Sequence, residues 1–174
     1  MHSKCVGDIM IPMDQYPHIP HWFTIRQAVA ELEHSEITVG DRKSLPRALL
    51  VFDETYELLG IVRRRDILRR LEPKYLQGIA HHHPKQWIDP QIDPDLVAMS
   101  MEKETESMRE QAEAPISEVM QPIEATVDFN DHISKAIYLM VSKDLNLIPV
   151  IKENNVVGVV RSVDVFHEVA DIIL

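Results

Sequence analysis

The sequence predicts an α+β fold in which two strand–helix–strand–strand–helix motifs form one module with pseudo-two-fold symmetry, with a helical connector between them. Two observations predict it. Three blocks of sequence recur in the same order, and each half repeats the same succession of apolar strands and amphipathic helices. We assign the first motif to residues 1–71, the connector to 72–114 and the second motif to 115–174.

The repeat consists of three matched pairs of segments. Each opening reads apolar, small, acidic, apolar, Met, any residue, Pro, and each ending reads Gly, two apolar residues, Arg, two further residues, Asp. A middle block at the start of a predicted helix keeps Ala and an apolar residue at one spacing. The pairs are Val6–Pro12 with Ile116–Pro122, Thr24–Val29 with His132–Ile137, and Gly60–Ile67 with Gly158–Val165.

In the second copy, a short strand at 125–127 is expected before a helix capped by Asn130 or Asp131. The apolar positions of that helix recur at helical spacing and point inward. A two-stranded hairpin and a last helix follow. Their expected positions are a buried strand at 147–151, a turn at Asn154-Asn155, a strand at 156–160, and a helix that Asp164 opens.

The first copy follows the same order with one insertion. The stretch at about 35–46 is polar and contains Gly40 and Pro46, so we expect a surface loop there. The expected elements are a helix at about 24–34, strands at about 48–53 and 58–63 around a hairpin at 53–56, and a helix from about Arg65.

The connector belongs to neither copy. Residues 73–80 are expected to form a helical turn or two, and Asp93-Pro94 is expected to start a helix that runs to about Ala112. Such a helix would cover either a groove of this chain or the surface of a partner.

Composition excludes several classes of protein. The formal net charge of −10 argues against a nucleic-acid-binding protein and against binding to an anionic membrane surface. No apolar run approaches the roughly 20 residues of a membrane helix. The single cysteine, Cys5, precludes an intramolecular disulfide, so we expect a reducing, cytoplasmic location.

These openings and endings, with the strand Leu147-Ile-Pro-Val150, resemble the CBS-domain family, named after cystathionine β-synthase. The resemblance implies that two motifs pack by their sheets. It also implies that the clefts between them hold AMP, ADP, ATP or S-adenosylmethionine, and that two modules stack into a homodimer.

The resemblance implies particular ligand-binding residues. The family's ending carries an Asp that accepts hydrogen bonds from ribose hydroxyls, and this Asp matches Asp66 and Asp164. The family's Thr or Ser near the phosphates is Arg63 in one copy and Arg161 in the other. Arginine there either binds phosphate as a bidentate fork or fills the cleft and blocks it.

Strand residues complete the expected site. The family's strand proline matches Pro149, whereas the first copy has Leu50, which makes the site that uses Leu50 the weaker candidate. The apolar strand residues Leu147, Ile148 and Val150 are expected to line the adenine slot, as are the segments after Met10 and Met120.

Other chemistry-bearing motifs are better explained without a site. The basic run 63–70 reads mainly as a solvated helix face. Three adjacent histidines, 81–83, cannot all face one metal ion on a helix, and catalytic zinc sites draw ligands from spaced positions. Cys5 has no recognisable catalytic partner, so we expect no enzyme and no obligatory cofactor.

Two functions follow. The first is a stand-alone regulatory module that binds an adenine nucleotide, forms a homodimer and signals energy or metabolite state to an unknown target protein. The alternative is a ligand-free dimeric interaction scaffold, which the two arginines and Leu50 favour. Neither function involves nucleic acid or a membrane.

Overall fold

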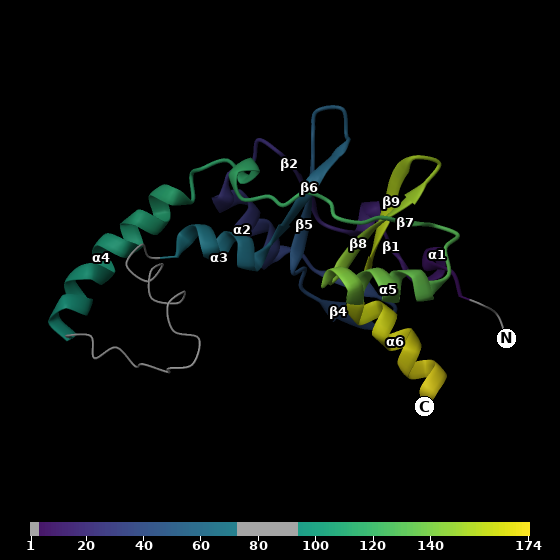
Figure 1. The fold of residues 1–174 in the computed structure, drawn as a ribbon. Helices are drawn as coiled ribbons and strands as arrows, with labels where there is room; N and C mark the ends of the chain where they lie inside the picture. Colours follow the sequence, from purple (N-terminus) through teal and green to yellow (C-terminus); the bar gives the residue numbers. More distant parts are fainter. Residues whose placement is uncertain (1–3, 73–93) are drawn as a thin grey trace.

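The computed structural model describes residues 4–72 and 94–174. It confirms the α+β fold with two similarly built halves (Figure 1). In the first half, the elements are α1 (Val6–Ile9), β1 (Ile11–Pro12), the 3-10 helix η1 (Met13–Gln15), β2 (His18–Pro20), α2 (Ile25–His34), β3 (Ile37–Val39), β4 (Arg42–Ser44), β5 (Ala48–Phe52), β6 (Leu58–Arg63) and α3 (Arg64–Leu71).

The connector and the second half supply the remaining elements. They are α4 (Pro94–Gln111), the 3-10 helix η2 (Ile116–Glu118), β7 (Val127–Asp128), α5 (Ile133–Lys143), β8 (Leu147–Lys152), β9 (Asn155–Arg161) and α6 (Ser162–Ile173). The strand, helix, hairpin and final helix of each copy therefore appear in the expected order.

Each motif has its own sheet. In the first, β5 pairs in parallel with β2 and antiparallel with β6; in the second, β8 pairs in parallel with β7 and antiparallel with β9. The registers match as well, because Val51 lies opposite Gly60 just as Val150 lies opposite Gly158. The paired strands of the two sheets thus correspond residue by residue.

The opening segments cross from one motif to the other. β1 pairs with β9 of the second motif, and α1 lies beside the same motif in Figure 1. In return, the backbone of Gln121 exchanges two hydrogen bonds with Ile61 of β6, and Ile116 donates its amide to the Phe23 carbonyl. Each opening therefore belongs structurally to the opposite half, and the exchange ties the halves together.

Three apolar clusters form the core. One is inside each motif, between its sheet and its helices. The third lies between the two motifs and includes Ile11, Leu50 and Val159. Strand residues alternate between these clusters, since successive side chains of a strand point to opposite faces.

The insertion at 35–46 forms a β-hairpin, so the expected surface loop was wrong. β3 and β4 pair antiparallel around Gly40, whose φ of 59° suits a glycine. Ile37 is fully buried and joins the cluster between the motifs. The alternation of Ile37 and Val39 before a glycine was the available signal.

Two local expectations need correction. His132, rather than Asn130 or Asp131, caps α5, because its ring nitrogen accepts the Ser134 amide. The β8–β9 turn lies one residue earlier than expected, at Glu153 and Asn154, which both have positive φ. That pair of left-handed residues matches the twist of the flanking strands.

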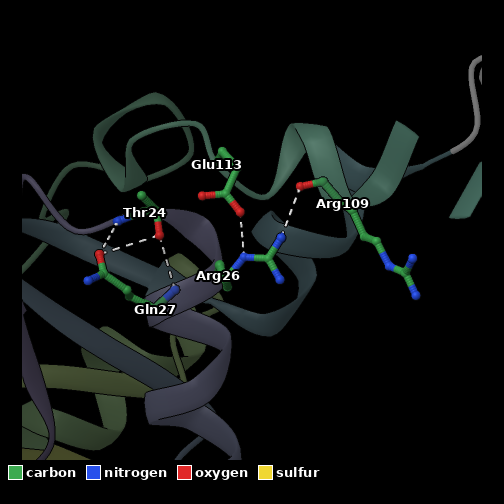
Figure 2. A network of polar contacts seen from close by, with 5 residues as sticks. All are labelled: Thr24, Arg26, Gln27, Arg109 and Glu113. Carbon is green, nitrogen blue, oxygen red and sulfur yellow. Dashed lines mark hydrogen bonds and ion pairs between the residues drawn. The ribbon is translucent and has the colours of Figure 1, made fainter. Parts of the chain in front are cut away.

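The connector helix α4 is confirmed and extends away from both motifs at the left of Figure 1. Its C-terminal end is fastened to α2. Figure 2 shows the Arg26 guanidinium paired with Glu113 and donating to the Arg109 carbonyl. The predicted helical turn at 73–80 and the three histidines at 81–83 lie outside the described residues.

Candidate functional site

The two repeated endings place an arginine and an aspartate side by side. Arg161 is the last residue of β9, and Asp164 lies in the first turn of α6, three residues on. The Arg161 guanidinium forms a bidentate ion pair with the Asp164 carboxylate. Nε donates to Oδ2 at 2.7 Å and Nη2 donates to Oδ1 at 2.9 Å. Asp164 is buried, and its charge also faces the positive end of the helix dipole.

The first motif repeats this pair. Arg63 Nε and Nη2 donate to the Asp66 carboxylate at 2.9 and 3.0 Å, and the Arg63 amide adds a third bond at 3.0 Å. Pairing with Asp66 raises the pKa of the Arg63 guanidinium. Both pairs are charge-assisted, bidentate and shielded on the carboxylate side, the strong class of hydrogen bond.

The pairing was missed at the sequence level. Arg and Asp three residues apart at the start of a helix are neighbours on one face, which was the available signal. Both oxygens of each carboxylate are engaged by an arginine, and each carboxylate keeps lone pairs for further hydroxyl donors.

Leu50 and Pro149 occupy equivalent positions. Leu50 lies opposite Ile61 across the hairpin of the first motif, and Pro149 lies opposite Val159 in the second. Both are buried. Leu50 belongs to the cluster between the motifs, at the face where the sheets meet.

Ile148 and Val150, which are expected to line the adenine slot, lie in the interior of the second motif. Both are fully buried in the cluster inside the second motif, together with Ile133 and Ala136 of α5. They alternate with Pro149 along β8, so their side chains point to the helix side of the sheet.

Different residues surround the two pairs. At the second, Arg161 Nη1 donates to Ser44 Oγ at 3.0 Å, which links the site to the β3–β4 hairpin. The buried Tyr16 lies near the same pair, and burial raises the pKa of its phenol. At the first, the carboxylates of Glu124 and Asp144 act on Arg63. The sequence carried no signal for these long-range neighbours.

The rest of the basic run is not gathered into a site. Arg64 and Arg69 are exposed, whereas Arg70 bonds Gln111 and Glu118. Within residues 4–72 and 94–174, no group of three metal-ligating side chains could hold an ion. No helix of that described part is long and apolar enough to cross a membrane.

Comparison with solved structures finds CBS-pair proteins with the same fold. CBSX2 from Arabidopsis thaliana is 16% identical, with a TM-score of 0.64, and the match covers 98% of this chain and 97% of that chain. A structure of CBSX2 in complex with AMP has 16% identity and a TM-score of 0.62, covering 97% of both chains.

A third neighbour is the CBS domain of a bacterial CNNM/CorC family Mg²⁺ transporter in complex with ATP. It is 14% identical, with a TM-score of 0.62 and coverage of 96% of this chain and 87% of that chain. Comparison with curated proteins gives no significant match.

The sequence profile of the CBS domain matches residues 6–73 and 116–171, one segment in each motif. These segments contain both crossed openings and both arginine–aspartate pairs, so the family assignment and the geometry concern the same residues. The chain belongs to the CBS-domain family and carries a tandem pair of its motifs.

Proposed function

We propose that this chain is a regulatory CBS-pair module that binds an adenine nucleotide at its arginine–aspartate sites and passes the occupancy to a target protein. The observation that carries the proposal is the duplicated pair, Arg63–Asp66 and Arg161–Asp164, at equivalent places in the two motifs. The AMP and ATP complexes of the structural neighbours support the choice of ligand.

The chemistry is an exchange of partners. A ribose offers two adjacent hydroxyl donors, one for each carboxylate oxygen, so the sugar can replace the guanidinium at Asp66 or Asp164 without leaving a buried charge unbonded. The released arginine offers a planar fork to a phosphate. In this arrangement, the sugar of the ligand bonds the aspartate and its phosphate bonds the arginine.

Signalling requires two arrangements of the module. A ligand shifts their populations only through unequal affinity for the two. The crossed strands hold the motifs together, and the ligand would change how they pack. Because the described residues place no catalytic constellation beside either pair, we expect binding without turnover. We also place the chain in the reducing cytoplasm, because it has a single cysteine.

A ligand-free interaction scaffold is the second candidate. The observation that favours it is that both carboxylates already have a partner. Each accepts two hydrogen bonds from the guanidinium of the arginine three residues before it. In that reading, the pairs are purely structural, and nucleotides have no effect on partner binding.

We also propose that the module forms a homodimer through α5 and α6. These adjacent helices expose apolar side chains at helical spacing. The exposed residues are Tyr138 and Val141 on α5 and Val163, Phe166 and Ile173 on α6. An apolar face of this kind is typical of a protein–protein contact.

A thermal-shift series with AMP, ADP, ATP and S-adenosylmethionine tests nucleotide binding. A ligand at about 100 times its Kd should stabilise the native chain by about 2.7 kcal/mol. The double variant Asp66→Asn/Asp164→Asn should lose the shift, whereas Arg69→Gln, an exposed arginine of α3, should keep it. Release of phosphate from ATP should stay at background.

The scaffold is the outcome if none of the four ligands shifts the melting temperature of the wild-type chain. A shift that survives the double variant would place the ligand away from the arginine–aspartate pairs and would refute the proposed site.

A further inference from the structure

The β3–β4 hairpin breaks the symmetry of the two sites. The crossed opening, the paired glycine and the arginine–aspartate pair each occur twice. The hairpin occurs once, within the insertion between α2 and β5 of the first motif. It reaches Arg161 through Ser44.

The hairpin supplies a further hydrogen-bond partner to Arg161 at the second site. Arg161 uses Nε and Nη2 on Asp164 and Nη1 on Ser44, so each of its three nitrogens has a partner. Its side chain is only 13% exposed. Ile37 of β3 is fully buried beside Tyr16 in the cluster between the motifs.

Tyr16 is a second buried neighbour of the Arg161–Asp164 pair. Its hydroxyl donates to the Ala48 carbonyl at 2.6 Å, which holds the buried ring in place near Arg161. A ligand that enters at Asp164 would have to remove Arg161 from three hydrogen bonds and displace packed groups. Unpaired buried polar atoms and a broken apolar contact both oppose that opening.

The first site lacks this cover. Ile19 on β2 and Val127 on β7 are equivalent positions of the two motifs, because each lies opposite the matching residue of its central strand. Three residues earlier in each motif, Tyr16 is therefore equivalent to Glu124. Glu124 is exposed where Tyr16 is buried. The Arg63 side chain is 37% exposed, and within the described part of the chain its Nη1 has no hydrogen-bond partner.

We infer that the β3–β4 hairpin closes the Arg161–Asp164 site and leaves Arg63–Asp66 as the one nucleotide site of the chain. The inference rests on the proposed function and reverses the sequence-level ranking, in which Pro149 made the second site the better candidate. Ser44 acts as a positioning residue, because it holds Arg161 on Asp164 without touching the ligand.

Calorimetric titration of the full chain with AMP and with ATP tests the assignment. Wild type should bind one nucleotide per chain. Asp66→Asn keeps the shape of the side chain but loses its charge, and should weaken binding at least about tenfold with no second site remaining. Arg63→Gln should also weaken binding, whereas Arg69→Gln should not. Melting curves of each variant establish that it is folded.

Two titration results would overturn the inference. One is a wild-type stoichiometry of two nucleotides per chain. The other is a folded Asp66→Asn variant that still binds one nucleotide with wild-type affinity, since that nucleotide would then occupy the supposedly closed site.

Arginine labelling tests the closure without any nucleotide. Phenylglyoxal reacts with accessible guanidinium groups, and peptide mass spectrometry separates the two sites. Arg63 should be modified several-fold faster than Arg161 in the native chain. Ser44→Ala should accelerate the labelling of Arg161. The control is Ser35→Ala, which should leave this labelling rate unchanged, because the hydroxyl of Ser35 bonds Glu31 and not Arg161.

The two experiments separate the failures. If wild type gives no heat with any nucleotide, the proposed function falls and the site assignment falls with it. Equal labelling of Arg63 and Arg161, or no response to Ser44→Ala, overturns the closure even when a nucleotide binds.

Discussion

At the scale of single residues, the repeated glycines permit the crossing of the opening segments. A Cβ at Gly158 would lie 2.3 Å from the Ile11 carbonyl oxygen, and one at Gly60 would lie 2.5 Å from the Gln121 oxygen. Both contacts are with backbone that is itself paired in a strand or bridge. The glycine of each ending is therefore needed for close backbone approach, independently of any ligand.

Gly158→Ala should destabilise the native chain by about 1–3 kcal/mol, because the methyl group must push β1 off β9. The reduced entropy of the unfolded chain offsets only about 0.4–1 kcal/mol of this. Urea denaturation measures the change. Gly40→Asn is the matched control: its surroundings are open and Asn tolerates positive φ, so its effect should stay within about 0.5 kcal/mol.

An unchanged midpoint for Gly158→Ala would show that the crossed strand yields easily. The close contact would then have no energetic importance, and the glycine would need another explanation.

At the scale of elements, α3 joins the first site to the connector. Its N-terminal turn holds Asp66, and Arg70 near its other end donates to Gln111 of α4 and Glu118 of η2. Arg26 of α2 fastens the same end of α4 (Figure 2). A displacement of α3 by a ligand at Asp66 would therefore be transmitted to α4.

Arg70→Ala should loosen the end of α4 without unfolding the chain. Backbone amides at 107–112 should exchange with deuterium several-fold faster than in wild type. In the variant, the two side-chain contacts that oppose local opening of this segment are absent. Global stability should fall by no more than about 1 kcal/mol, as expected for partly exposed contacts. Arg69→Ala, which alters an exposed neighbour on the same helix, should change neither quantity.

Equal exchange rates in wild type and Arg70→Ala would mean that packing alone holds α4. The transmission from α3 through Arg70 would then be abandoned.

At the scale of the whole molecule, the exchanged openings make one unit of two motifs. α1 buries Val6 and Ile9 in the core of the second motif, while Ile116 and Val119 enter the core of the first. Neither motif has a complete core without the other's opening. The apolar face of α5 and α6 stays exposed in this arrangement and is the surface that we propose for a homodimer contact.

Phe166→Glu should convert the expected homodimer to a monomer, because Phe166 is 73% exposed within one chain and a charge cannot be buried there without a partner. Sedimentation velocity measures the change. Trp22→Ser is the control: Trp22 is 57% exposed on the turn after β2, away from α5 and α6.

A wild-type chain that sediments as a monomer at high concentration would refute the dimer. A dimer that persists in Phe166→Glu and in Val141→Glu, at the other exposed helix, would place the contact elsewhere on the molecule.

Much of the site could be predicted from the sequence. The positions of Asp66 and Asp164 at helix starts follow from local pattern, and so does the equivalence of Leu50 and Pro149, since both depend on short-range periodicity. The packing of Ile148 and Val150 against the helix side of the sheet could not be predicted, because an unbroken apolar strand does not reveal which face meets the helices.

The sequence by itself determined the duplicated motif, its order of elements and the glycines and acids at its endings, because these depend on residues close along the chain. Tertiary structure decided the rest: the crossed openings, the hairpin that reaches Arg161, and the difference between the two sites. Those features depend on contacts between residues far apart in sequence, such as Ser44 with Arg161, which are 117 positions apart. Repetition of local pattern makes the two sites look alike, and packing of an insertion present in one copy makes them differ.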